Sequence, residues 1–145
     1  MIYFDTSYLV RLYHEDPGAA EVRKLAGTDH VACAWHGQAE MLAAFHRKLR
    51  EGAIRPSAYA ALLDQFQTHD AAGAFQWLMQ GPEVMARIAE VYARLPATVF
   101  LRAADALHLA AAAEHGFKVV YSNDTHLLAA AAHFGLEGRN VIVAA

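Results

Sequence analysis

The sequence is poor in cysteine and has no long apolar run, and each absence excludes a class of protein. Its one cysteine, Cys33, excludes an internal disulfide and a zinc site built from cysteines. Asp, His, Glu or Arg interrupts every apolar run before it reaches the length of a membrane span. No basic segment precedes the first apolar residues, as one does in a secretory signal. We therefore expect a cytoplasmic protein without a membrane segment.

The balance of charge gives little guidance about partners. There are 12 Lys and Arg against 15 Asp and Glu, a net charge of −3 that argues against binding to nucleic acid. If a metal ion neutralises the four acids described below, however, the remaining surface is nearly balanced and has room for local basic patches. The densest basic segment, residues 46–50, is also explained as a solvated helix face. Hydrophobic residues make up 56% of the chain, so we expect some exposed apolar surface for a protein partner.

Short β-type runs alternate with helical patterns along the chain. The expected strands are residues 1–4, 30–34, 74–79, 117–121 and 140–143; the expected helices are residues 6–13, 19–25, 35–51, 82–95, 101–115 and 125–134, with another that opens at Pro56. This alternation predicts an α/β protein with a short parallel sheet between two helical layers, a three-layer α/β/α sandwich. The helices on either side of Gly52 form an αα hairpin. Because we find no linker, repeat or low-complexity segment, we expect a single domain over residues 1–145.

Two acids stand directly between a predicted strand and a predicted helix. Asp5 follows the first strand, and Asp124 follows the strand at residues 117–121. Ligands of open α/β sheets collect outside the carboxyl ends of the strands, so these carboxylates are candidates for a shared site. The alternative is that they cap helices, although at Asp5 the hydroxyls of Thr6 and Ser7 also offer capping oxygens.

Two further acids lie within predicted helices. Asp105 lies near the buried face of an apolar helix, where Asp has poor helix propensity, and a salt bridge to Arg102 is the alternative explanation. Small alanines surround Glu40 and leave room for a ligand to come close. The alternative for Glu40 is an exposed side chain paired with Arg47 or Lys48.

Together the four acids predict a site for a hard cation. Carboxylate oxygens suit Mg²⁺ or Mn²⁺ rather than Zn²⁺. Asp5, Glu40, Asp105 and Asp124 would hold one such ion, or two with substrate bound. A site of this kind hydrolyses phosphodiesters with a metal-activated water.

In the order, spacing and content of its motifs the chain resembles the PIN domain, and within that family the VapC-type toxin ribonucleases of type II toxin–antitoxin systems. The matching motifs are IYFDTS at residues 2–7, Glu40 in the helix at residues 35–51, LRAADALHLA at residues 101–110 and YSNDTHL at residues 121–127. The resemblance covers essentially the whole chain. It implies a PIN-like sandwich whose acidic pocket, formed by the four acids, supports Mg²⁺- or Mn²⁺-dependent cleavage of RNA.

The same resemblance implies supporting residues and partners. Ser7 matches a hydroxyl that lines the site, and Asn123 lies beside the last acid. A homodimer and a cognate antitoxin that reaches into the pocket are also implied. For contact with RNA phosphates the candidates are Arg11, Arg47, Arg50 and Arg102.

The nine histidines add no clear metal motif. We expect His108, on the same side of its helix as Asp105, to be a partly buried histidine with satisfied hydrogen bonds. His126 either lies on a helix surface or touches a substrate phosphate. The spacing of the histidines at positions 30, 36, 46 and 69 is not that of a zinc site.

Two other functions remain open. The first is a non-catalytic module that binds Mg²⁺ or RNA without turnover. The second is a haloacid-dehalogenase-like phosphatase with Asp5 as its nucleophile. That family needs a second Asp two residues later, where this chain has Ser7, and this difference disfavours the phosphatase.

Overall fold

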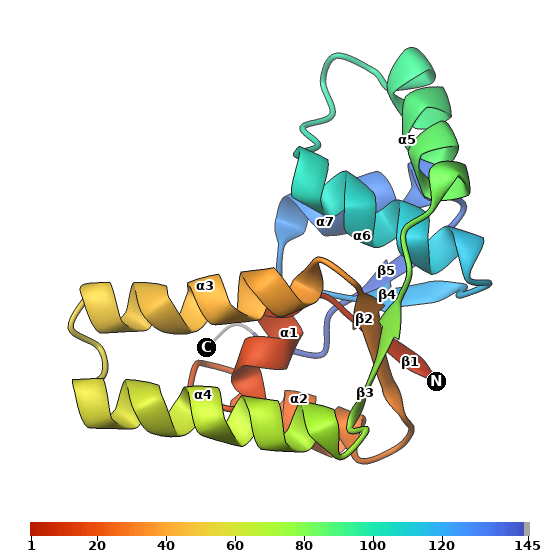
Figure 1. Ribbon diagram of the computed structural model, residues 1–145. Coiled ribbons are helices and arrows are strands. Elements are labelled where there is room, and N and C mark those ends of the chain that lie inside the picture. The colour runs from red at the N-terminus through yellow and green to blue at the C-terminus, as the bar shows by residue number, and fades with distance from the viewer. Residues whose placement is uncertain (144–145) are drawn as a thin grey trace.

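The computed structural model describes residues 1–143, which form a five-stranded parallel sheet in the order β3-β2-β1-β4-β5 (Figure 1). The strands are β1 (Ile2–Phe4), β2 (Val31–Ala34), β3 (Phe75–Leu78), β4 (Val119–Tyr121) and β5 (Glu137–Arg139). The helices are α1 (Thr6–Arg11), α2 (Ala19–Ala26), α3 (Gly37–Arg50), α4 (Pro56–Ala71), α5 (Pro82–Arg94), α6 (Ala103–Glu114), α7 (Thr125–Ala130) and the 3₁₀ turn η1 (Ala131–Phe134).

Helices cover both faces of the sheet, which confirms the predicted three-layer α/β/α sandwich. Helices α1 to α4 pack on one face, and α5, α6, α7 and η1 pack on the other (Figure 1). Successive strand residues point to opposite faces, so Phe4 and Cys33 join one hydrophobic core while Tyr3 and Ala32 join the other. The molecule therefore has two cores, one on each side of a thin sheet.

The predicted αα hairpin is present as α3 and α4, which run side by side (Figure 1). Gly52 follows α3 with a positive φ of 72°, a conformation that glycine adopts without steric cost. Pro56 occupies the first turn of α4, where its missing N–H has no helical partner to lose.

The last strand was predicted in the wrong place. The apolar run at residues 140–143 suggested a strand, but β5 is Glu137–Arg139, a mostly exposed edge strand paired with β4. Because β5 lies at the edge of the sheet and two of its three residues are exposed, its sequence has few apolar residues from which a strand could be predicted. Gly138 permits the close approach of α7, because a Cβ at this position would lie 2.9 Å from the Leu128 side chain.

The apolar residues after β5 pack over the α1 and α2 side instead. Val141 and Ile142 are partly buried against that core. The Tyr8 hydroxyl donates to Asn140 Oδ1 at 2.7 Å and accepts from the Val141 N–H at 2.7 Å. The burial of this segment explains its apolar character without a strand.

Within residues 1–143, no helix combines the length and apolar character that crossing a membrane requires.

Candidate active site

The four predicted acids lie at the starts of four helices. Asp5 and Asp124 are the N-cap residues of α1 and α7, while Glu40 and Asp105 lie in the first turns of α3 and α6. The positive end of a helix dipole favours an acid at each of these places. Asp105 was expected in a helix interior, but α6 begins at Ala103, so its propensity is better than predicted.

Asp5 is the most enclosed of the four acids. It follows β1, and its backbone N–H donates to the carbonyl of Tyr121, which ends the neighbouring strand β4. Its Oδ1 accepts from the Ser7 hydroxyl at 2.6 Å and the Tyr8 N–H at 3.2 Å, and its Oδ2 accepts from the Ser122 hydroxyl at 2.5 Å. The Asp5 side chain is therefore the cap of α1, and the prediction that Thr6 or Ser7 would supply that cap was wrong.

Asp124 combines a cap with a second interaction. Its Oδ1 accepts from the N–H groups of His126 and Leu127, so the capping alternative holds. Its Oδ2 accepts from Arg102 at 2.6 Å. The Ser122 hydroxyl accepts from the Asp124 N–H at 2.9 Å while it donates to Asp5, and it thus links the two acids. Capping occupies Oδ1 of each acid, while Ser122 contacts Oδ2 of Asp5 and Arg102 contacts Oδ2 of Asp124.

Arg102 joins Asp105 to Asp124. Its Nε lies 3.1 Å from Asp105 Oδ2, the salt bridge foreseen as an alternative, and its Nη2 lies 2.6 Å from Asp124 Oδ2. Asp105 is buried at 7% exposure, as its place near the buried face of the helix predicted. The single positive charge of the guanidinium thus lies between two carboxylates and offsets their charge only in part.

Glu40 contacts Thr6 and His108 rather than a lysine or arginine. Its Oε1 accepts from the Thr6 hydroxyl at 2.8 Å and lies 2.6 Å from His108 Nε2. The predicted alternative of a pair with Arg47 or Lys48 is wrong, because those side chains bind Glu51 and Asp16.

The surroundings shift the pKa values of these acids in different directions. Burial raises the pKa of Asp5, although its hydroxyl and N–H donors and the charge of His108 oppose this. Burial also raises the pKa of Asp105, against the opposing effect of Arg102. Burial also raises the pKa of Glu40, but the hydrogen bond and the charge of His108 outweigh burial, and the pKa of Glu40 is lowered overall. The chain therefore buries negative charge here with only partial compensation.

His108 has satisfied hydrogen bonds, as expected, but it is fully buried rather than partly buried. Its Nδ1 lies 2.6 Å from the Tyr3 hydroxyl. Burial lowers its pKa, but its neighbours raise it well above the usual histidine value. The thiol of Cys33 lies 3.9 Å away and stays neutral near pH 7 because burial raises its own pKa, so the Glu40 carboxylate is the partner that holds His108 protonated.

The predicted supporting residues and the predicted RNA-contacting arginines differ in their hydrogen bonds and exposure. The Ser7 hydroxyl, besides donating to Asp5, accepts from the Asn123 N–H at 3.0 Å. Arg11 donates to the carbonyls of Ser7 and Pro17. Ser7, Arg11, Arg47 and Lys48 line a hollow of about 270 Å³ together with Glu51; none of the four acids lines it. Arg50 is exposed on α3.

Sequence reasoning missed Ser122, Thr6 and His36. Ser122 is fully buried, and its signal is its position directly after β4. Thr6 was considered only as a cap. His36 was set aside for want of zinc-like spacing, but it lies one helical turn before Glu40, and its Nε2 is 3.5 Å from Glu40 Oε1.

Comparison with known proteins places this arrangement in a family. The family model described as PIN domain matches residues 2–133. No curated protein matches the chain in sequence. Among solved structures, the chain is similar to VapBC2 from Rickettsia felis bound to a DNA fragment from its promoter, with 15% identity, a TM-score of 0.67, and coverage of 97% of this chain and 98% of that one.

Two further solved structures share the fold. FitAcB from Neisseria gonorrhoeae has 18% identity and a TM-score of 0.73, with coverage of 95% of this chain and 96% of that one. FitAB bound to the IR36 DNA fragment has 19% identity and a TM-score of 0.73, with coverage of 100% and 98%. The family match spans nearly all of the sheet and every acid described above, and the chain therefore belongs to the PIN domain family.

Proposed function

We propose that this protein is a Mg²⁺- or Mn²⁺-dependent endoribonuclease, the toxin member of a toxin–antitoxin pair. The observation that supports this most directly is that Ser122 and Arg102 link three acids at helix starts: Ser122 contacts Asp5 and Asp124, and Arg102 contacts Asp105 and Asp124. Glu40 is the fourth proposed ligand, at the start of α3. Membership of the PIN domain family and the resemblance to VapC-type toxins point to the same chemistry.

The side chains present fit a hard divalent ion. The proposed donors are all carboxylate oxygens, which Mg²⁺ and Mn²⁺ prefer. Asp5 and Asp105 are buried, and burial of a carboxylate is unfavourable unless a cation compensates it. A bound ion supplies Lewis-acid activation of water and offsets the negative charge that grows on the scissile phosphate.

The chain itself orients the proposed ligands. Ser7 and Ser122 fix the Asp5 carboxylate by donating to opposite oxygens. Thr6 and His108 both contact Glu40 Oε1, and within residues 1–143 no side chain bonds to Oε2, which can therefore face a ligand. Such hydrogen bonds to ligating groups sharpen metal affinity because they remove the entropy cost of orienting them.

The substrate we propose is single-stranded or looped RNA, held by its phosphates. The hollow beside Ser7 is lined by Arg11, Arg47 and Lys48, and Ser7 connects it to Asp5 through the hydrogen bond between their side chains. Cations along a groove of this kind track a nucleic acid backbone without reading its sequence. Arg102, more than half exposed, is placed to leave its carboxylates and contact a phosphate near the cleaved bond.

The test compares RNA cleavage by wild type and two matched variants. Asp5→Asn keeps the hydrogen-bonding shape but removes the charge, and we expect it to abolish cleavage while the circular dichroism stays native. Asp64→Asn makes the same change on an exposed face of α4 and should cleave normally. Replacement of Mg²⁺ by Ca²⁺, or addition of a chelator, should silence the wild type. Full cleavage by purified Asp5→Asn, or RNA binding without any cleavage by wild type, would contradict the proposal.

We also infer a homodimer and a protein antitoxin as partners. Met85 and Tyr92 are seven residues apart on α5, so they share one face of that helix, and both are largely exposed. An exposed apolar face of this kind favours protein association. Light scattering on wild type and on a Met85→Ser, Tyr92→Ser double variant tests the dimer, and a wild-type monomer would exclude it.

A further inference from the structure

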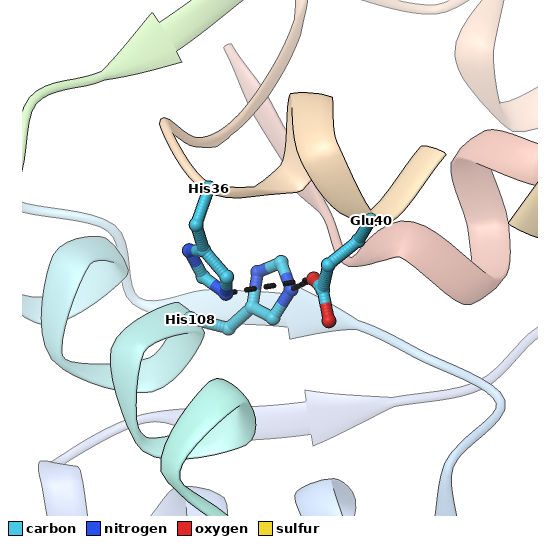
Figure 2. Close-up of side chains that lie close together, drawn as sticks. All are labelled: His36, Glu40 and His108. Carbon is cyan, nitrogen blue, oxygen red and sulfur yellow. Dashed lines mark hydrogen bonds and ion pairs between the residues drawn. The ribbon is translucent and has the colours of Figure 1, made fainter. Parts of the chain in front are cut away.

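Two histidines and a glutamate converge where the start of α3 comes close to α6 (Figure 2). His108 Nε2 lies 2.6 Å from Glu40 Oε1, and His36 Nε2 lies 3.5 Å from the same oxygen. One ligand atom from each of the three residues lies within 4.8 Å of the others. Among residues 1–143 this is the one group of three or more His, Cys, Asp or Glu side chains that is so compact.

The outer nitrogen of each imidazole is held by another side chain. His36 Nδ1 lies 2.9 Å from the Gln80 amide, and His108 Nδ1 lies 2.6 Å from the Tyr3 hydroxyl. Histidines that ligate metals have the far ring nitrogen engaged in this way. The near nitrogen of His36, Nε2, donates to the Ala104 carbonyl oxygen at 3.1 Å, and this hydrogen bond must break before Nε2 can face an ion. The rings of His36 and His108 are also in contact, with centroids 4.3 Å apart.

We propose that His36, Glu40 and His108 form a second metal site, which takes a borderline transition ion such as Zn²⁺. Two imidazole nitrogens and one carboxylate oxygen are a ligand set that Zn²⁺ accepts in three-ligand sites with an open fourth position. Mg²⁺ avoids such nitrogen donors. The two sites thus differ in chemistry while sharing Glu40.

To admit the ion, His36 Nε2 must release the Ala104 carbonyl, and one of the two distances to Glu40 must lengthen. Tetrahedral ligands about 2.1 Å from Zn²⁺ are about 3.4 Å apart. The present separation of 3.5 Å between His36 Nε2 and Glu40 Oε1 already meets this value. The contact of 2.6 Å between His108 and Glu40 must open by about 1 Å as the ion replaces the proton that the two share. Glu40 is about one-third exposed, which gives the ion a path from solvent.

Because the two proposed sites share Glu40, Zn²⁺ should affect RNA cleavage, an inference that rests on the proposed nuclease function. An ion drawn onto Glu40 by the two histidines withdraws that carboxylate from the acidic pocket and adds positive charge beside it. We therefore expect micromolar Zn²⁺ to inhibit Mg²⁺-dependent cleavage in wild type but much less in a His36 variant.

The deciding experiment is Zn²⁺ binding by calorimetry, with Co²⁺ absorption as a second readout, on the untagged full chain. We expect one Zn²⁺ per chain and a visible Co²⁺ spectrum of high intensity, which reports four-coordination. His36→Gln should weaken binding roughly 100-fold, because one of three ligands is lost. His133→Gln, an exposed histidine on η1, should change neither readout.

Asp105→Asn separates this site from the acidic one. It should retain Zn²⁺ binding even though the proposed nuclease activity is lost. Absence of stoichiometric Zn²⁺ binding by wild type would overturn the second site, as would binding that survives His36→Gln. Binding lost in Asp105→Asn but retained in His36→Gln would instead place the ion among the acids.

Discussion

Arg102 occupies the place in the acidic pocket where a cation is most needed, so its removal gives a sharp test of the proposed metal site. In the structure its guanidinium contacts both Asp105 and Asp124. A divalent ion held by the same carboxylates must displace this side chain or tolerate its repulsion. Arg102→Gln removes the positive charge and keeps a polar side chain, so we expect it to bind Mg²⁺ more tightly than wild type.

The expected gain in Mg²⁺ affinity follows from the solvent exposure of the two ion pairs that Arg102 makes. The Arg102 side chain is 55% exposed, so each of its two pairs contributes about 0.5–1 kcal/mol, as exposed pairs do. Mg²⁺ binding to the variant avoids the loss of both pairs, a gain of about 1–2 kcal/mol. This corresponds to a Kd lower by about five- to thirtyfold.

The assay is calorimetric titration with Mg²⁺ of wild type, Arg102→Gln and a control, Arg94→Gln, which changes an exposed arginine at the end of α5. Only Arg102→Gln should bind more tightly. Cleavage at saturating Mg²⁺ then isolates any contact of Arg102 with RNA, because loss of such a contact lowers kcat/KM without weakening the metal. Unchanged or weaker Mg²⁺ binding in Arg102→Gln would refute the idea that the guanidinium and the ion compete for these carboxylates.

Three further predictions concern stability. Gly37→Ala should lower the free energy of unfolding, measured in urea, by about 1–3 kcal/mol, because the added Cβ would lie 2.5 Å from Cys33 Sγ. A second substitution, Cys33→Ala, removes that sulfur and should restore the lost stability. A double variant that is no more stable than Gly37→Ala would contradict the clash as the cause. Asp16→Asn should lower the free energy of unfolding by about 1 kcal/mol near pH 7, since the ion pair with Lys48 is lost. Burial raises the pKa of Asp16, but Lys48 outweighs this effect and holds the pKa below its usual value. The stability difference between wild type and Asp16→Asn should therefore vanish as the pH falls through that lowered pKa. A stability difference that persists in acid would contradict this role of the ion pair. Tyr8→Phe should speed amide hydrogen exchange in the segment after β5, because the Tyr8 hydroxyl bonds to Asn140 and Val141 in that segment. Unchanged protection of these amides would contradict that role of the hydroxyl.

The sequence pattern predicted the layers of the fold and the places of the acids because both depend on local signals. An apolar run followed at once by an acid and a helix, as at Asp5 and Asp124, marks a strand end and a helix start together. The edge strand β5 was misplaced because its residues are exposed, and the apolar run beyond it packs on a helix layer instead.

Contacts between distant segments were beyond the reach of the pattern. His36 and His108 lie 72 positions apart by their numbers, and only the fold brings their rings together, with the residue that caps α3 close to α6. Ser122 gives no composition signal, yet its hydroxyl joins two of the acids. Arg102 was considered for either a salt bridge or an RNA phosphate, and only the structure shows that it bridges two carboxylates.

The division of the pocket between the two helical layers has a consequence for the order of protein synthesis. Asp5 and Glu40 belong to the layer translated first, whereas Asp105 and Asp124 come from segments that leave the ribosome near the end. The proposed cleavage site therefore stays incomplete until α6 and β4 have docked. A nascent chain of this protein is expected to be harmless to the messenger that encodes it, and ribosome-stalled chains that end before β4 should show no cleavage.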